Sequence, residues 1–519
     1  MNRDAALNIV RGANPKFDLV IIGGGATGAG VALDAASRGL KVLLLERGDF
    51  GSGTSSRSTK IIHGGVRYLA QGRVGLVREA LRERATLLRN AAHLVAPLSF
   101  IVPVENIFER AKYFVGLKFY DFLSGKQRPQ SCDWLSRDTL RRQLPELDDT
   151  KFCGAMRYFD GQFDDTRLLL AILETATVLG AVAINYAEVT EVHKDSKGRL
   201  NAVTFRDGET NAVHEIKTEA VVNATGAGSD AILKLDEPGH RRTILPSQGA
   251  HIVLPKEFLP GTSALLMPRT PDGRIMFAIP WLGHVMVGTT DTEVDVVAKD
   301  PIPLASEIDM ILDVAAQYLT RAPQRSDVLA SFAGIRPLAL APSGSETSKV
   351  SREHRIDVLK SGMISVSGGK WTTYRLMAEQ CVDTLISSNN LSVGRSMTAE
   401  MPLHATPQSD HRAKRFVEYG NHAQALEEMI LNEPALDDLL SDALPYRKVH
   451  CLWAVRHEMA RTIEDVLARR TRALFLNEAA ALEALPQVLE ILTRELGLTE
   501  LQQQKQIQEF HKIKNKQPS

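Results

Sequence analysis

The chain has 519 residues, of which 44% are hydrophobic and 24% are charged. This length predicts two to four domains, and the composition is typical of globular proteins and excludes wholesale disorder. Sixty-two basic residues balance 62 acidic ones, so the formal net charge is zero. A nucleic-acid partner is not expected, because proteins of that class usually carry a strong basic excess.

The cysteines and the lengths of the hydrophobic runs limit which kinds of site the protein can contain and where in the cell it is expected. The four cysteines lie far apart and form no CxxC pair, so we expect no zinc ribbon, iron–sulfur cluster or other metal site, and a reducing compartment. The N-terminal segment lacks the apolar core of a signal peptide. No run of about 18 apolar residues occurs, so any membrane contact is expected to be peripheral.

Residues 18–46, DLVIIGGGATGAGVALDAASRGLKVLLLE, predict a phosphate-binding start. An apolar strand at 19–22 leads into Gly23, Gly25 and Gly28, which satisfy the GxGxxG pattern. A helix predicted over 26–37 directs its N–H groups at phosphates, and a strand at 42–45 ends in Glu46, placed to accept hydrogen bonds from an adenosine ribose. This order of strand, glycines, helix, strand and acid predicts a dinucleotide-binding unit, although a glycine-rich turn in an ordinary α/β unit is the alternative. It does not choose between FAD and NAD.

Residues 54–69, TSSRSTKIIHGGVRYL, are rich in hydroxyl groups, backbone donors and cations. From the residues alone, an extended cofactor and a polar loop explain this segment equally well. The stretch resembles the flavin-contacting segment of the FAD-dependent, quinone-linked (aerobic) glycerol-3-phosphate dehydrogenase family. The resemblance covers nearly the whole chain and is most specific here and at residues 364–375. It implies FAD as the cofactor.

Residues 223–230, NATGAGSD, follow an apolar strand and fit GxGxxA, which suggests a second nucleotide site. We reject it, because the predicted helix ends by Pro238 and no second strand with a terminal acid follows. The better interpretation is the ATG motif of two-domain flavoproteins, where the chain passes near the cofactor. Members of the family commonly continue with Pro-Trp, whereas this chain has Ala227 and Gly228.

Residues 364–375, ISVSGGKWTTYR, predict a strand that ends at Gly368 and Gly369 and a helix that begins near Trp371. A helix N-terminus at the flavin would stabilise the negative charge that reduction places on the N1–C2=O edge. In the family this is the C-terminal FAD-contact motif; a tight strand-to-helix turn is the alternative. In total, the resemblance implies cofactor contacts at Gly23, Gly25, Thr27, Gly28, Glu46, Thr54, Ser55, Ser58, Lys60, Ile61, His63, Gly64, Val189, Ala224, Thr225, Gly226, Gly368, Gly369 and Thr372.

We expect an α/β fold with a Rossmann-like FAD-binding domain of the amino-acid-oxidase type, an antiparallel-sheet substrate domain and a C-terminal helical domain. Alternating runs broken by Pro and Gly between residues 245 and 290 predict the antiparallel sheet. The expected boundaries are 17–75, 155–235 and 345–388 for the discontinuous FAD-binding domain, 76–154 and 236–344 for the substrate-binding domain, and 389–519 for the helical domain. In the helical domain we see no reactive cluster, and residues 505–519 are expected to fray.

An anionic phosphate ester needs several guanidinium or ammonium donors. The resemblance implies that Arg67, Tyr68, Arg336, Arg352 and Lys370 bind sn-glycerol 3-phosphate. Each arginine alone is more typical of a solvated or ion-paired surface residue. Their joint occurrence in separate matching motifs favours a substrate site.

Oxidation of a secondary alcohol to a ketone, here dihydroxyacetone phosphate, requires loss of a hydride and of a proton. His251 matches the active-site histidine of the family and is the first choice of general base, since imidazole titrates near neutral pH. Arg336 would stabilise the developing alkoxide, because arginine stays protonated. His63 could exchange roles with His251. The reduced FAD would pass its electrons to a quinone.

Quinones lie in the bilayer, so a quinone-reducing enzyme must contact a membrane. Residues 107–128 mix aromatic and cationic residues on a predicted amphipathic helix, which suits an anionic interface; a core-facing helix is the alternative. We therefore expect a cytoplasmic enzyme held peripherally at the cytoplasmic membrane. The oligomeric state stays open, a homodimer included.

Three other functions remain open from the sequence. A glycerol-3-phosphate oxidase would use O₂, although such relatives generally carry an inserted segment that is not found here. An amine or amino-acid oxidase of the same fold would lack the cationic cluster. An FAD-binding scaffold would not react with any polyol phosphate.

Overall fold

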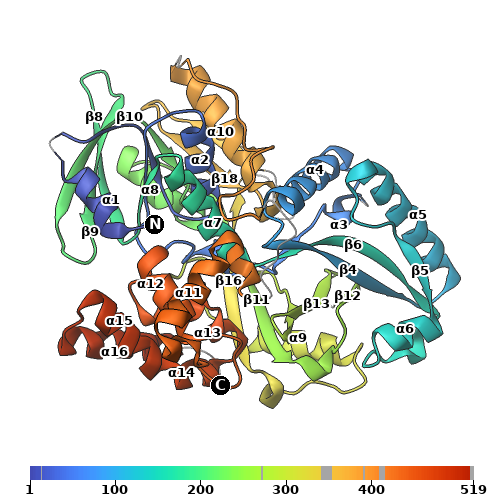
Figure 1. Ribbon diagram of the computed structural model, residues 1–519. Helices are drawn as coiled ribbons and strands as arrows, with labels where there is room; N and C mark the ends of the chain where they lie inside the picture. The colour runs from blue at the N-terminus through green and yellow to red at the C-terminus, as the bar shows by residue number, and fades with distance from the viewer. Residues whose placement is uncertain are drawn as a thin grey trace.

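The computed structural model describes residues 1–12, 14–69, 71–270, 273–340, 354–389, 392–407 and 415–514. Two large β-sheets lie next to each other, and helices of the C-terminal segment (orange to red) pack beneath the first sheet and beside the second (Figure 1). Consistent with the α/β fold that the sequence predicts, helices cover both faces of the first sheet.

The first sheet has the strand order β17-β18-β10-β1-β2-β7, with β9 paired to β10 and β8 to β9. Neighbours from β18 to β7 run parallel, whereas β17 and β9 are antiparallel. The strands are β1 (Lys16–Ile22), β2 (Val42–Leu45), β7 (Val182–Ile184), β8 (Ala187–Lys194), β9 (Leu200–Asp207), β10 (Val213–Asn223), β17 (His354–Val358) and β18 (Ile364–Gly368).

The first sheet is buried on both faces because successive side chains of β1 point to opposite sides. Leu19 and Ile21 pack with helices α2 (Ala26–Ser37), α7 (Asp165–Val178) and α10 (Tyr374–Asn389). Val20 and Ile22 pack with α1 (Arg3–Val10) and with strands β8 and β9 on the other face. This explains the continuous apolar run in the sequence.

The βαβ unit predicted at the start of the chain is confirmed. The helix spans Ala26–Ser37 and the second strand Val42–Leu45, as expected, and the helix is followed by Gly39 with φ of +86°. The rejection of a second dinucleotide unit is also confirmed. After β10 and α8 (Ser229–Asp236) the chain enters the second sheet at β11, and β18, the parallel neighbour of β10, follows only after β16, so α8 does not lead into the next strand of a second βαβ unit.

The second sheet has the order β15-β11-β14-β13-β12-β4-β6-β3, with β16 paired to β11 and β5 to β6. In the part of the chain that the structure describes, its strand pairs are antiparallel except that of β12 with β4, so the antiparallel prediction is confirmed for residues 245–290. The strands are β3 (Ile61–Ile62), β4 (Val95–Val104), β5 (Asp133–Ser136), β6 (Gly154–Phe163), β11 (Ile244–Pro255), β12 (Ala264–Met267), β13 (Met276–Trp281), β14 (His284–Gly288), β15 (Thr292–Glu293) and β16 (Ala330–Ala339).

Helices cover the second sheet on both sides as well. Phe100 of β4 packs with α5 (Ile107–Ser124), whereas the next residue, Ile101, packs with α6 (Arg137–Gln143) and α9 (Ala305–Ala316). The shorter α3 (Val66–Leu69) and the longer α4 (Val74–Asn90) connect β3 to β4. β3 and β6 belong to this sheet although their residues fall within segments predicted for the FAD-binding domain.

The C-terminal segment is helical, as predicted. Its α-helices are α11 (Ala423–Asn432), α12 (Lys448–His457), α13 (Ala473–Leu476), α14 (Glu478–Glu483), α15 (Leu485–Leu496) and α16 (Glu500–Lys514), and a π-helix spans Asp465–Arg470. The prediction that residues 505–519 fray is wrong for 505–514, which lie in α16. There Phe510 is 2% exposed and joins the core, whereas residues 515–519 lie outside the described part.

Candidate active site

The glycine turn after β1 has no room for side chains. A Cβ on Gly28 would lie 1.9 Å from the carbonyl oxygen of Gly23, and a Cβ on Gly23 would lie 2.7 Å from that of Ala224. Gly23 has φ of +111°, a conformation that favours glycine. Gly25 caps α2 without a side-chain hydrogen bond. The helix N-terminus, where Thr27 lies in the first turn, therefore suits an anionic group such as a pyrophosphate.

Glu46 supports this turn from the end of β2. Its Oε2 accepts a hydrogen bond from the Gly24 N–H (2.6 Å), and its Oε1 accepts one from the Gly48 N–H (2.8 Å). Desolvation raises the pKa of the Glu46 carboxyl above its ordinary value, although these two hydrogen bonds oppose the shift. The contact of Glu46 with a ribose stays a prediction.

Motifs far apart in the sequence meet around the glycine turn. The Ala224 N–H donates to the Ile22 carbonyl (2.9 Å), which brings the ATG motif of Ala224, Thr225 and Gly226 against the turn. The Ala26 N–H at the start of α2 donates to Ser55 Oγ (2.9 Å). The Trp371 indole N–H donates to the Ser55 carbonyl (2.9 Å). The structure thus joins residues of all four predicted cofactor motifs.

A cavity of about 1180 Å³ opens beside these motifs, which exceeds the roughly 300–1,000 Å³ common for ligand sites. Segment 54–69, the second sheet and the β18–α10 turn all contribute to its wall. The predicted site residues in its lining are Thr54, Ser58, Ile61, His63, Tyr68, His251, Arg336, Gly368, Gly369, Lys370 and Thr372.

His251 is a buried residue of β11 in the cavity wall. Its Nε2 lies 2.9 Å from Thr59 Oγ1, and its Nδ1 has no hydrogen-bond partner among the residues that the structure describes. The ring stacks on Phe332 with a centroid distance of 4.9 Å. Burial, reinforced by the charges of Lys60 and Arg336, lowers the pKa of His251 well below its ordinary value. The imidazole is therefore neutral at neutral pH and able to accept a proton.

Arg336 of β16 points across the sheet toward β11 and the residues after β14. Its Nη2 donates to Thr289 Oγ1 (2.9 Å) and to the Thr290 carbonyl (3.0 Å), and Nη1 lies 3.3 Å from Asp291. A Cβ on Gly249 would lie only 2.3 Å from Arg336 Nη2. The absence of a side chain at position 249 thus allows the guanidinium to lie in the cavity wall.

Further cationic side chains give this wall a positive character. Lys370 Nζ lies 3.9 Å from the centre of the Tyr68 ring, a cation–π contact. Arg57 and Arg274 also line the cavity and pair with Asp300 and Asp291, respectively. Such a wall suits an anionic ligand.

Lys60 lies beneath the cavity rather than in its lining. Its Nζ is fully buried and donates to Asp165 (2.6 Å) and to the Ser56 carbonyl (2.8 Å). Asp165 also accepts hydrogen bonds from the N–H and the hydroxyl of Ser58. The side chain of Lys60 is therefore a buried ion-pair partner that fixes segment 54–59, and the cofactor contact expected of Lys60 stays a prediction.

Other predicted residues take different places. Gly64 is packed so closely that a Cβ would lie 2.4 Å from both Leu81 Cδ2 and Tyr120 Oη, and its N–H donates to Tyr120 Oη. Val189 is buried in β8 and is not part of the cavity lining. The side chain of Arg67 and the whole of Arg352 lie outside the described residues. Their roles stay predictions.

Arg57, Thr59 and Arg274 are among the lining residues that sequence reasoning missed. Arg57 and Thr59 lie inside the segment 54–69 that was singled out, so the signal was present. Nothing in the sequence around Arg274 distinguishes it from other surface arginines, because the pairing of β13 with its neighbours places it at the cavity.

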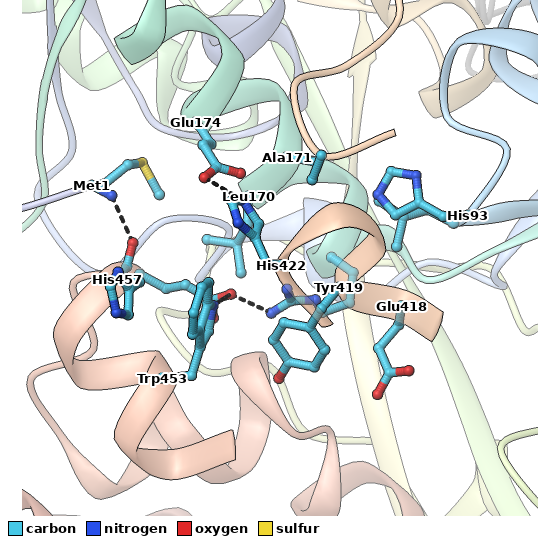
Figure 2. A pocket seen from close by; sticks show the side chains of 14 residues that line it. Met1, His93, Leu170, Ala171, Glu174, Glu418, Tyr419, His422, Trp453 and His457 are labelled. Carbon is cyan, nitrogen blue, oxygen red and sulfur yellow. Dashed lines mark hydrogen bonds and ion pairs between the residues drawn. The ribbon is translucent and has the colours of Figure 1, made fainter. Parts of the chain in front are cut away.

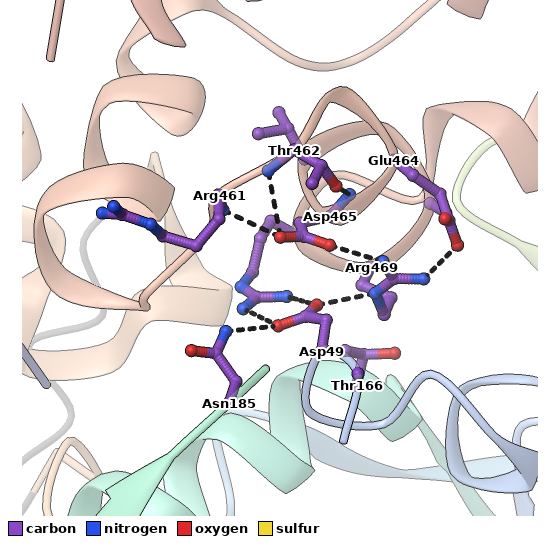
Figure 3. Close-up of polar contacts among 12 residues, drawn as sticks. Asp49, Thr166, Asn185, Arg461, Thr462, Glu464, Asp465 and Arg469 are labelled. Carbon is purple, nitrogen blue, oxygen red and sulfur yellow. Dashed lines mark hydrogen bonds and ion pairs between the residues drawn. The ribbon is translucent and has the colours of Figure 1, made fainter. Parts of the chain in front are cut away.

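The C-terminal segment supports the site through a buried network that the sequence analysis missed (Figure 3). Asp49, three residues after Glu46, accepts hydrogen bonds from Arg469 Nε (2.6 Å) and from Arg470 Nη1 (2.6 Å). Arg472 donates to the Ser56 carbonyl (2.5 Å) and lies 3.3 Å from Asp165. These arginines are nearly inaccessible to solvent. They join the last third of the chain to the loops that form the site.

Comparison with known proteins agrees with this geometry. Residues 18–380 match the family "FAD dependent oxidoreductase", and residues 364–503 match the "C-terminal domain of alpha-glycerophosphate oxidase". The mitochondrial glycerol-3-phosphate dehydrogenase of Mus musculus is 39% identical, with 98% of this chain and 74% of that protein covered. The Homo sapiens protein is 38% identical, with 99% and 75% covered.

Solved structures are similar as well. The glycerol-3-phosphate dehydrogenase from Bacillus halodurans complexed with FAD has a TM-score of 0.79 and 28% identity, and the match covers 98% of this chain and 96% of that one. The L-alpha-glycerophosphate oxidase from Mycoplasma pneumoniae with FAD bound has a TM-score of 0.59 and 18% identity over 74% of this chain and 97% of that one, which shows a shared fold.

The residues present fit FAD. The glycine turn offers a pyrophosphate a helix N-terminus whose N-cap residue, Gly25, has no side chain to cap it. The large adjoining cavity, with its aromatic and cationic wall, can hold the ring system and a second ligand. With the sequence match over nearly the whole chain, these features show that the chain belongs to the FAD-dependent glycerol-3-phosphate dehydrogenase family and is an oxidoreductase with FAD as its cofactor.

Proposed function

We propose that this enzyme oxidises sn-glycerol 3-phosphate to dihydroxyacetone phosphate and that its electrons pass to a membrane quinone. The names of the relatives support the substrate. The observation that carries the proposal is the cavity wall, where the cations of Arg336 and Lys370 lie together with the neutral imidazole of His251. Such a wall can hold a phosphate and accept a proton from a neighbouring hydroxyl.

The cationic residues bind and orient the substrate. Arg336 is held by Thr289 and Thr290, so its guanidinium is preorganised for an oxygen that becomes negative as the hydroxyl loses its proton. Lys370 supplies a second positive charge, for the phosphate. Arg67 and Arg352 are proposed to contribute further phosphate contacts, on the basis of the family resemblance.

His251 accepts the proton. Its Nε2 lies 2.9 Å from the Thr59 hydroxyl, which lines the same cavity. The proton therefore reaches Nε2 from the substrate hydroxyl, either directly or through Thr59. His63 also lines the cavity and is the alternative base. Bound FAD supplies the hydride acceptor.

An anaerobic titration tests the substrate. We expect glycerol 3-phosphate to bleach the flavin absorption band of the purified holoenzyme, whereas glycerol and glycine leave it unchanged. Bleaching by the amino acid alone would indicate an amine or amino-acid oxidase, and no bleaching by any of the three would indicate a scaffold. Rapid O₂ consumption in an oxygen electrode would favour the oxidase alternative over a quinone-linked dehydrogenase.

Helix α5 supports the proposal of a membrane contact. Ile107, Phe108 and Phe122 are 70%, 83% and 74% exposed, an unusual state for large apolar side chains. Exposed cations of the same segment, Lys118 and Lys126 among them, complement an anionic surface. None of the helices in the described ranges is both long and apolar enough to cross a bilayer.

The cavity links this helix to the site. Ala111, Tyr113, Val115 and Phe119 of α5 line the same cavity as His251 and Arg336, although they belong to its apolar end. We propose that a quinone reaches the flavin through this end while the enzyme lies on the bilayer. A cytoplasmic location at the cytoplasmic membrane is part of this proposal.

A liposome experiment tests the membrane contact. We expect the holoenzyme to sediment with vesicles of phosphatidylglycerol, and the Phe108→Ser/Phe122→Ser variant to sediment much less. The matched control is Leu431→Ser, at a leucine of α11 that is 79% exposed. Turnover with a water-soluble dye should be equal in all three proteins. Equal sedimentation of the double variant and the wild type would contradict the role of α5.

A further inference from the structure

A second polar cluster lies between α7 and the C-terminal segment (Figure 2). Glu174 projects from α7, His422 ends the 3₁₀ helix Val417–His422, and His404 lies on the preceding loop. One ligand atom from each of these three residues lies within 4.8 Å of the other two. Glu174 Oε1 and His422 Nε2 are 2.8 Å apart and face each other.

Backbone contacts hold the three residues together. The His404 N–H donates to Thr175 Oγ1 of α7 (3.0 Å). The Asn421 N–H donates to the Ala405 carbonyl (2.8 Å), and a Cβ on Gly420 would lie only 2.0 Å from that carbonyl oxygen. The loop of His404, the turn before His422 and helix α7 are thus fixed against one another. The fold therefore fixes the backbone positions from which the three side chains project.

The side chains are also restrained. The His422 ring packs on the Trp453 ring with a centroid distance of 5.1 Å, and the His404 and His422 rings are 5.9 Å apart. The nearby Arg167 is neutralised by Glu458 at 2.6 Å.

We propose that Glu174, His404 and His422 bind a divalent transition-metal ion of the Zn²⁺ type. Two imidazole nitrogens and one carboxylate oxygen form a common zinc ligand set, with water in the fourth position. Metal–ligand distances of about 2.0–2.2 Å place tetrahedral ligand atoms roughly 3.3 Å apart. Ligand atoms that lie within 4.8 Å of one another therefore need to approach by up to about 1.5 Å, which the exposed His404 side chain allows.

This site departs from the expectation of no metal, which rested on the absence of paired cysteines. The three ligands are far apart in the sequence, so no motif could reveal them. Because they come from α7 and from the C-terminal segment, the ion cross-links the two. Its binding is thereby coupled to the stability of their contact.

The test uses the untagged holoenzyme, freed of metal with a chelator. We expect ZnCl₂ to bind at one ion per chain in isothermal titration calorimetry and to raise the unfolding temperature. His404→Ala should weaken zinc binding by at least about tenfold, since loss of even an outer-shell partner costs 10–100-fold. His404 is exposed, so this variant should fold like the wild type.

Two controls complete the experiment. His511→Ala, at an exposed histidine of α16, should bind zinc like the wild type. Glu174→Gln should weaken binding while flavin content and turnover without zinc stay unchanged. The proposal is overturned if zinc does not bind, or if His404→Ala and the wild type bind it with the same affinity and the same rise in unfolding temperature.

Discussion

Replacing Asp49 with asparagine tests how strongly the C-terminal segment stabilises the cofactor loops. Asp49 is 1% exposed and accepts hydrogen bonds from Arg469, from both terminal nitrogens of Arg470 and from Asn185. Asn keeps the size of the side chain but removes its charge. The variant leaves two buried guanidinium groups without their shared counter-ion.

The structure sets the magnitude of this effect. Breaking a buried ion pair by removal of one partner costs about 3–5 kcal/mol. The two arginines overcome the effect of burial and lower the pKa of Asp49 from 3.8 to about 2, which by linkage alone corresponds to ~2 kcal/mol. We therefore expect Asp49→Asn to lower the free energy of unfolding by about 3 kcal/mol. The exposed pair of Glu188 and Arg206 gives the control, since Glu188→Gln should cost less than ~1 kcal/mol.

Urea unfolding of the holoenzyme, followed by circular dichroism and by flavin release, measures the difference at pH 7. Because the folded-state pKa of Asp49 is depressed, its contribution is complete above pH 3.8 and is lost as the pH falls from 3.8 to about 2. The difference between wild type and variant should shrink over that range. If Asp49→Asn and Glu188→Gln unfold at the same urea concentration at pH 7, the buried network does not stabilise the loops and the reasoning is refuted.

Three further predictions concern the cavity. Arg336→Ala should reduce kcat/KM by about tenfold to a hundredfold while the flavin content stays constant, because it removes charge-assisted hydrogen bonds worth about 1.5–3 kcal/mol. If the variant has wild-type kinetics, Arg336 does not belong to the substrate site. Gly249→Ala places a Cβ 2.3 Å from Arg336 Nη2, so KM should rise with retained flavin, and an unchanged KM would show that the position of the guanidinium is unimportant. Because the pKa of His251 is depressed, kcat/KM should stay constant as the pH falls through 6.5 and should decline only below that pH. A decline centred above pH 6.5 that is absent in His251→Asn would contradict the prediction that the buried imidazole is neutral at pH 6.5.

Local patterns made the first βαβ unit predictable from the sequence. Its glycine spacing and apolar strands leave few alternatives, and the same holds for the turn at Gly368 and Gly369 before α10. That His63, His251 and Lys370 meet at one cavity followed from the family resemblance, which singled them out in three distant segments. These positions could not have been joined by spacing alone.

The remaining features depend on contacts between segments far apart in the chain. Asp49 and Arg469 are separated by 420 positions, so the sequence does not indicate that they pair. Without knowledge of such partners, the arginine-rich helix that contains Arg469 is predicted to be exposed to solvent. The ion pair of Lys60 with Asp165 could not be predicted, because nothing near Lys60 in the sequence indicates Asp165. The polar, basic composition of residues 505–519 hid α16, because Phe510, Ile507 and Ile513 anchor this helix only where a core is present to receive them.

The position of Arg469, Arg470 and Arg472 near the end of the chain has a consequence for biosynthesis. The glycine turn and its neighbouring acid Asp49 leave the ribosome first, whereas Arg469 and Arg470, which neutralise Asp49, are made hundreds of residues later. A nascent chain thus holds the Asp49 carboxylate without these two counter-ions until Arg469 and Arg470 have been synthesised. The loops beside the glycine turn therefore gain these buried ion pairs only after the C-terminal helices have been synthesised and have packed against them.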